Sequence, residues 1–279
     1  MTPLRLATVP YVNAAPLLWG FRRGSLRDRC TVVAEPPARI PDLLLEGKVD
    51  AGLVPIIAAP ALARAGIALL PSPGVASRRV ARSVFVASRR PIETITTVAL
   101  DRSSRTSQAL ARIVLAERVP RPIRYTEAAP SLDDMLRHHD AALLIGDAAL
   151  LADTRGLEVL DLAEAWRAMT GLPFVFAAWA VRPGRAAAEA PPLFEQSLAE
   201  GLERVDAIGA ECAATLGLPA GLVIEYLRDN IHYRLGPEEA RAAALFLARA
   251  RDLGIVAGDL APLDPAAALS AEAAPGRMP

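Results

Sequence analysis

The reactive side chains of this sequence form no familiar catalytic grouping. The three histidines are His138, His139 and His232, and no H-E-x-x-H metal motif is present. The sequence also contains no G-x-G-x-x-G motif, no phosphate-binding loop with a lysine and no G-x-S-x-G nucleophile turn. No two carboxylates have a convincing spacing for acid–base work. The remaining candidates are uncharged polar residues in turns.

One feature recurs along the chain: an apolar segment of strand length runs into a polar turn, and a helical pattern follows. A helix N-terminus offers free N–H groups and a partial positive charge, which suits a carboxylate ligand. The alternative is that these polar residues only cap their helices. The run from Ser103 to Ser107 has more hydroxyls than a cap requires. The turns are Pro10-Tyr11-Val12-Asn13, Val54-Pro55, Ser103-Ser104-Arg105-Thr106-Ser107 and Gly146-Asp147.

Two further segments carry candidates. Between Ser77 and Ser83 lie three arginines, which either hold a carboxylate in a bidentate fork or belong to a solvated loop. The two serines are the better site candidates. The apolar segment over residues 170–179 is either a plain core strand or, through Gly171 and Pro173, a shaped turn at the cleft.

Composition excludes several classes of protein. The 279 residues suggest about two domains. Thirty-one basic and thirty-one acidic residues balance, so binding to nucleic acid or to an anionic membrane is not favoured. Lys48 is the only lysine, so a Schiff-base mechanism would depend on it alone. Cys30 and Cys212 do not form a disulfide framework or a thiolate zinc site. We find no signal peptide and no membrane span, and we expect a cytoplasmic protein.

Hydrophobic periodicity predicts the elements that position these turns. Short apolar strands alternate with helical patterns from residue 4 to residue 181, which is typical of an α/β fold with mostly parallel sheets. After Pro183 the pattern becomes helical up to about Arg251.

Read together, four segments resemble the chorismate dehydratase family of the futalosine route to menaquinone. The first and the last are quite specific in combination, whereas the second also occurs in many solute-binding proteins. The segments are Tyr11-Val12-Asn13-Ala14-Ala15-Pro16-Leu17, Val49-Asp50-Ala51-Gly52-Leu53-Val54-Pro55, Leu143-Leu144-Ile145-Gly146-Asp147-Ala148-Ala149-Leu150 and Thr170-Gly171-Leu172-Pro173-Phe174-Val175-Phe176-Ala177.

The resemblance implies a two-lobed fold like that of type II periplasmic binding proteins, in which each lobe is a mostly parallel sheet flanked by helices. With crossovers near residues 87–91 and 177–182, residues 1–90 and 178–279 would form lobe 1, residues 91–177 would form lobe 2, and the ligand would bind in the cleft between them. One departure is visible: Arg79 stands where the family usually has glycine, which puts the loop geometry in doubt.

The resemblance further implies loss of water from chorismate, with Asn13 and Ser83 as catalytic residues. Asp147 is either a second candidate for the base or a helix cap. We expect no cofactor and no metal, and the oligomeric state stays open. The alternatives are a non-catalytic small-carboxylate binding protein of the same fold and the naphthoate-forming synthase of the same pathway. The expected substrate-binding residues are Tyr11, Val54, Pro55, Ser77, Ser103, Ser104, Thr106, Ser107, Gly146, Asp147, Gly171, Pro173 and Phe174.

Overall fold

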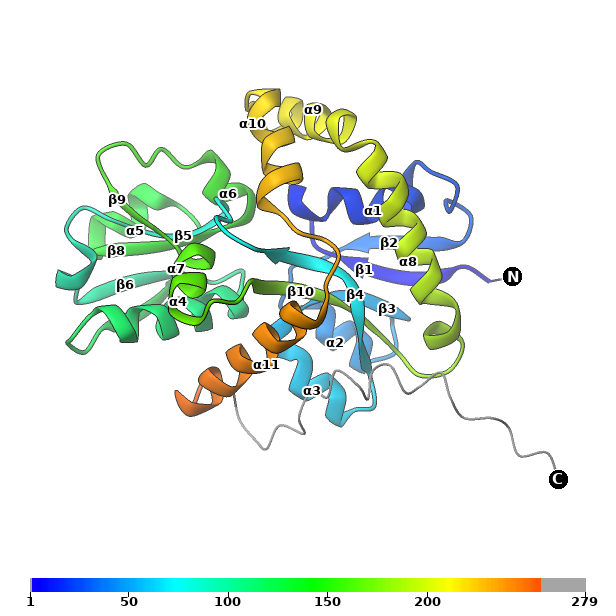
Figure 1. Cartoon of the computed structure of the whole chain (residues 1–279), viewed down its shortest axis with the longest axis horizontal. Coiled ribbons are helices and arrows are strands. Elements are labelled where there is room, and N and C mark those ends of the chain that lie inside the picture. The colour runs from blue at the N-terminus through cyan, green and yellow to red at the C-terminus, as the bar shows by residue number, and fades with distance from the viewer. Residues whose placement is uncertain (1, 257–279) are drawn as a thin grey trace.

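Two five-stranded sheets form the frame of the computed structural model, which describes residues 2–256 (Figure 1). Both sheets are mixed, because each contains two parallel and two antiparallel pairings. The first sheet has the order β2 (Cys30–Ala34), β1 (Leu4–Thr8), β3 (Ala51–Pro55), β10 (Phe174–Val181) and β4 (Ala68–Ser77). The second has the order β7 (Arg124–Ala128), β6 (Thr97–Asp101), β8 (Ala141–Ile145), β5 (Val84–Ser88) and β9 (Glu158–Asp161).

Helices follow most of the strands, and the chain ends in a helical region. The predicted α/β architecture with two lobes is confirmed, but the sheets are mixed rather than mostly parallel, because the segments that cross between the lobes enter each sheet antiparallel to its neighbours. The α-helices are α1 (Ala15–Arg22), α2 (Ile40–Leu45), α3 (Ala59–Arg64), α4 (Arg105–Arg118), α5 (Leu132–His138), α6 (Gly146–Leu151), α7 (Leu162–Thr170), α8 (Arg185–Glu203), α9 (Val205–Leu216), α10 (Ala220–Glu225) and α11 (Pro237–Asp252). Short turns of helix are η1 (Val12–Ala14), η2 (Ile56–Ala58), η3 (Ile92–Thr94) and the π-helical η4 (Tyr226–Asn230).

The chain crosses between the sheets at residues 78–83 and 171–173, earlier than the predicted crossovers near residues 87–91 and 177–182. Main-chain pairing decides these positions. Strand β5, predicted for lobe 1, pairs with β8 and β9 in the second sheet, and all of β10 pairs with β3 and β4 in the first. Residues 257–279 of the predicted lobe 1 lie outside the described residues.

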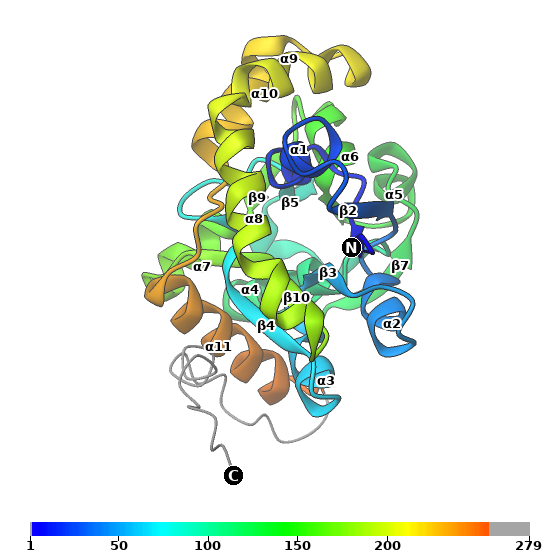
Figure 2. The ribbon, with the colours of Figure 1, turned by 90° about the vertical axis from the view of Figure 1, so that its right-hand side faces the viewer.

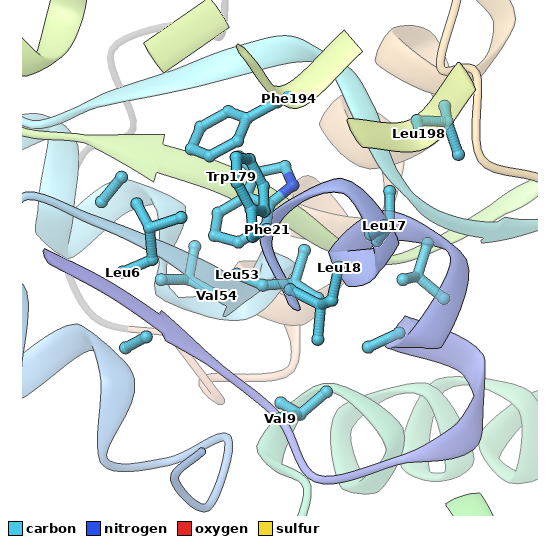
Figure 3. Packing of buried hydrophobic residues seen from close by; sticks show 14 of the residues in the cluster. Leu6, Val9, Leu17, Leu18, Phe21, Leu53, Val54, Trp179, Phe194 and Leu198 are labelled. Carbon is cyan, nitrogen blue, oxygen red and sulfur yellow. The ribbon is translucent and has the colours of Figure 1, made fainter. Parts of the chain in front are cut away.

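Aromatic rings fill the core of the first lobe. The Trp179 ring stacks on Phe194 of α8 with centroids 4.2 Å apart, and Phe21 of α1 meets the same Phe194 ring edge-on at 5.8 Å (Figure 3). In the second core, Trp166 and Phe174 are 5.6 Å apart, and Phe246 of α11 lies 5.1 Å from Phe174. Helix α11 therefore closes the core beside the crossing between the lobes.

Small residues let α1 and α8 approach closely (Figure 2). The buried Ser197 hydroxyl donates to the Leu17 carbonyl at 2.8 Å and accepts the Gly20 N–H at 3.1 Å. A Cβ on Gly201 would lie 2.0 Å from the Pro16 carbonyl oxygen. Because α1 directly follows η1, the packing of α1 against α8 fixes the position of η1.

Within residues 2–256, no helix combines the length and the apolarity needed to span a bilayer.

We expect Gly201→Ala to lower the free energy of unfolding by about 3 kcal/mol, because the new methyl group meets rigid backbone at 2.0 Å. The matched control is Gly221→Ala, where a Cβ meets nothing within 4 Å and which we expect to keep or slightly raise the melting temperature. Denaturant unfolding of both variants tests this. Equal stabilities would contradict the close approach of α1 and α8.

Candidate functional site

A cavity lies where the two sheets face each other. Its volume is about 60 Å³. Several predicted residues meet there: Tyr11, Asn13, Pro55, Ser83, Ser104, Ser107 and Gly146. The other lining residues, which the sequence reasoning missed, are Val9, Pro37, Leu53, Val75, Val84, Ile145, Phe176 and Ala177. The site therefore combines apolar walls with a few uncharged polar groups.

Asn13 and Tyr11 come from the turn that follows β1. Tyr11 is extended, and the chain then enters η1, which carries Asn13. Burial raises the pKa of the Tyr11 phenol, opposed by a hydrogen bond with Ser103. Gly146 faces this ring from the other lobe with φ of 59°, and a Cβ there would lie 3.1 Å from the Tyr11 Cδ1 atom. Glycine at this position lets the two lobes approach at Tyr11.

The start of α4 contributes the hydroxyls. Ser104 is the N-cap of this helix, and its Oγ accepts the Ser107 N–H at 3.2 Å. The two hydroxyls also bond to each other at 3.1 Å. Ser104 and Ser107 are both buried and both line the cavity. A cap and a ligand site are thus compatible here, because α4 has 14 residues and both Ser104 and Ser107 at its start line the cavity.

Ser83 ends the linker, which we define as residues 78–83 between β4 and β5. The Asp161 carboxylate accepts the backbone N–H of Ala81 at 3.1 Å and of Arg82 at 2.8 Å. Arg82 has φ of 61° and is the only non-glycine residue with positive φ in residues 2–256. The strained residue is therefore Arg82, whereas Arg79 is exposed and does not have a positive φ.

Eight predicted binding residues lie outside the cavity lining, each for a structural reason. Val54 is fully buried in the first core (Figure 3), and Phe174 belongs to the second. Gly171 ends α7 with φ of 72°, and the Pro173 carbonyl accepts the Trp166 indole N–H at 3.0 Å. Pro173 and Phe174 are thus buried in the core, whereas Gly171 is exposed at the end of α7.

The four polar residues of this group lie close behind the cavity wall. The Ser103 hydroxyl donates to Asp101 at 2.6 Å, and the Thr106 hydroxyl accepts the Ile57 N–H of the other lobe at 3.4 Å. The Ser77 hydroxyl is buried and has no hydrogen-bond partner among residues 2–256. Asp147 accepts the Val12 N–H of the other lobe at 3.1 Å. Thr106 and Asp147 therefore hold the lobes together at the two sides of the site.

Two larger hollows lie elsewhere. One, of about 350 Å³, lies on the far side of Tyr11 between α1 and α9 and is lined by Asp147 and Cys212 among others. The other, of about 550 Å³, lies on the outside of lobe 2 along α4 and β7. Only the cavity between the sheets brings Asn13, Ser83 and the α4 hydroxyls together.

Several solved structures resemble this fold. A crystal structure of a protein from Archaeoglobus fulgidus matches with a TM-score of 0.73 at 18% identity, covering 91% of this chain and 99% of that one. The alkanesulfonate-binding protein of Xanthomonas axonopodis pv. citri matches with a TM-score of 0.70 at 19% identity, covering 96% and 98%. A Candida albicans protein described as having the generic periplasmic-binding-protein fold matches at 0.65 and 15% identity, covering 93% and 92%.

Two α/β lobes joined by two crossing segments, with a cavity between them, define a protein of the periplasmic-binding-protein fold. At the level of sequence, the chorismate dehydratase of Thermus thermophilus is 33% identical over 256 residues, which cover 84% of this chain and 90% of that protein. Residues 4–252 match the family described as menaquinone biosynthesis, and the chain belongs to that family. The predicted resemblance is thereby confirmed.

The contact between Asp147 and Val12 predicts a graded effect on stability. Asp147→Asn keeps an oxygen for the Val12 N–H, whereas Asp147→Ala leaves that N–H unpaired and should cost about 1–3 kcal/mol. Burial raises the pKa of the Asp147 carboxyl, so the folded state binds a proton more readily than the unfolded state. The wild type therefore loses stability relative to Asp147→Asn as pH rises through that raised pKa.

Denaturant unfolding of the three proteins at several pH values measures both effects. Alanine and asparagine variants of equal stability would show that the bond to Val12 contributes nothing. A wild-type protein that gains on the asparagine variant with rising pH would contradict the sign.

Proposed function

We propose that this protein dehydrates chorismate to 3-[(1-carboxyvinyl)oxy]benzoate, as a carbon–oxygen hydro-lyase of the futalosine route to menaquinone. Membership of the menaquinone biosynthesis family and the 33% identity to a chorismate dehydratase support this function. The observation that carries this proposal is the cavity between the lobes. Asn13 lines it from the first lobe, and Ser83 and the hydroxyls at the start of α4 line it from the linker and the second lobe.

The reaction removes the C4 hydroxyl of chorismate together with the hydrogen on C3, and the ring becomes aromatic. The C3–H bond is vinylogous to the ring carboxylate, so negative charge formed at C3 delocalises into that carboxylate. The electron pair then expels the C4 oxygen, which leaves as water after taking up a proton. The enzyme must supply donors where this charge develops and must keep water away.

In this proposal the start of α4 binds one substrate carboxylate. Its N-terminal N–H groups and the hydroxyls of Ser104 and Ser107 supply hydrogen bonds without a full positive charge. Asn13 and Ser83 then face the ring, where the amide and the hydroxyl stabilise developing charge. Phe176, Val75 and Leu53 form apolar walls that exclude water from the reacting bonds.

The lining of the cavity bears on the identity of the base. Among the described lining residues, none carries a carboxylate, an imidazole or an amine, and the only titratable lining group is the Tyr11 phenol, whose pKa is raised by burial. Asp147 lies outside this lining and accepts the Val12 N–H. We therefore propose that the enolpyruvyl carboxylate of the substrate takes the C3 proton and that the protein fixes the conformation in which it can do so.

The cavity of about 60 Å³ is well below the ~300–1,000 Å³ of typical ligand pockets. We infer that the two lobes are closed on each other in this structure. Entry of the substrate then breaks the contacts of Asp147 with Val12 and of Thr106 with Ile57. The cytoplasmic location stays a prediction.

To test this function, the purified protein is incubated with chorismate. The reaction is monitored by the loss of diene absorbance, and the product is identified by mass spectrometry. We expect turnover to continue after dialysis against a strong chelator, because the described residues contain no cluster of three potential metal ligands. Binding of chorismate without turnover would favour the non-catalytic alternative. Activity that is lost on chelation and restored by a divalent metal would contradict the metal-free reaction.

Asn13→Ala separates catalysis from helix capping. Asn13 is the N-cap of neither helix, because Tyr11 caps η1 and Ala14 caps α1, so we expect a nearly normal melting temperature. Loss of a donor aimed at developing charge should reduce kcat roughly 100- to 1000-fold, with a modest change in chorismate affinity. Asn13→Asp, which keeps the shape but replaces the amide donor by an oxygen, should fall into the same range. A variant with more than about a third of wild-type turnover would remove Asn13 from the proposed mechanism.

A further inference from the structure

A strap from the C-terminal region, which we define as residues 225–239, lies along the linker between the lobes (Figure 1). Its backbone pairs with β4, since His232 and Ala76 exchange N–H···O bonds of 2.7 and 2.9 Å. Asn230 donates to the Val80 carbonyl at 3.0 Å. Ion pairs link Arg78 to Glu239 and Arg82 to Glu225. The strap thus contacts the linker along most of its length.

Tyr226 is the residue of the strap that reaches the cavity wall. It begins the π-helical turn η4, a form that is often found at functional sites. Its side chain is fully buried, and its hydroxyl donates to the Ser83 Oγ at 2.8 Å. Burial raises the pKa of this phenol, while hydrogen bonds with Ser83 and Asn13 oppose the shift. The phenol therefore contacts Ser83, one of the two residues expected to act on the substrate.

The hydrogen-bond inventory shows what this contact does. A serine hydroxyl has one proton to donate, and Tyr226 occupies one of its two acceptor positions. Among residues 2–256 the Ser83 hydroxyl proton finds no acceptor, and Ser83 lines the cavity. That proton is therefore free to donate to a ligand in the cavity.

We propose that Tyr226 is a positioning residue of the dehydration reaction, which orients the Ser83 hydroxyl toward the substrate. This inference rests on the proposed function. It gives the C-terminal region a part in the chemistry, because the strap orients a donor of the cavity without lining the cavity itself.

Tyr226→Phe removes the phenol oxygen and keeps the buried ring. We expect kcat to fall about tenfold, the size of one ordinary hydrogen bond, while KM changes less than twofold. The matched control is Tyr233→Phe in the same strap, because that phenol is also buried but has no hydrogen-bond partner among the described residues. This control should keep wild-type kcat and KM.

A double-mutant cycle with Ser83→Ala distinguishes positioning from a general structural effect. If Tyr226 acts through Ser83, the double variant should have a kcat within about twofold of Ser83→Ala alone. This comparison also serves if Tyr226→Phe alone folds poorly, because removal of both partners of a buried hydrogen bond is often nearly neutral for stability.

The outcomes separate the two proposals. If the wild-type protein leaves chorismate unchanged, the proposed function is overturned. The role of Tyr226 in that reaction is then overturned as well. Active wild-type protein with an undiminished kcat in Tyr226→Phe overturns the role of Tyr226 alone. So does a further tenfold loss in the Ser83→Ala background, or an equal loss in Tyr233→Phe.

Discussion

The buried carboxylate of Asp161 joins the second lobe to the linker, on which the site depends. It caps α7 by accepting the N–H groups of Ala163 and Glu164, both at 3.0 Å, and it also accepts those of Ala81 and Arg82. Burial raises the pKa of this carboxyl and these donors lower it. The bonds offset the cost of left-handed backbone at Arg82, of order 1–2 kcal/mol. These bonds therefore fix the conformation of the linker, and with it the position of Ser83.

The other parts of the site are arranged around this fixed linker. Strand β5 starts directly after Ser83, and the Ser83 carbonyl accepts the Gly146 N–H at 2.7 Å, so the linker sets where α6 begins. Gly146 in turn faces Tyr11, and the next residue, Asp147, accepts the Val12 N–H. A chain of short contacts thus runs from Asp161 through the linker to the turn that carries Asn13.

Sequence patterns located the turns of the site because strand and helix periodicity marks where each strand ends, as at Asn13, Ser104 and Gly146. They failed where a motif serves packing: Gly171 and Phe174 belong to a specific segment, yet their roles are a helix end and a core contact. Tyr226 was missed because its partner Ser83 lies 143 residues away, and nothing local marks a tyrosine in a helical pattern as a contact across lobes. The lobe boundaries were misplaced because apolar periodicity does not reveal which sheet a strand joins.

The uncharged character of the cavity agrees with the proposed chemistry. A guanidinium or ammonium beside the enolpyruvyl carboxylate would stabilise its anionic form and make it a weaker base. Hydroxyls, an amide and helix N–H groups hold a carboxylate with less loss of basicity, and the apolar walls raise its affinity for a proton by desolvation. No arginine lines the cavity, and Arg78 and Arg82 of the linker pair with Glu239 and Glu225 of the strap. Because the lining contains no guanidinium, none lowers the basicity on which proton transfer depends in the proposed mechanism.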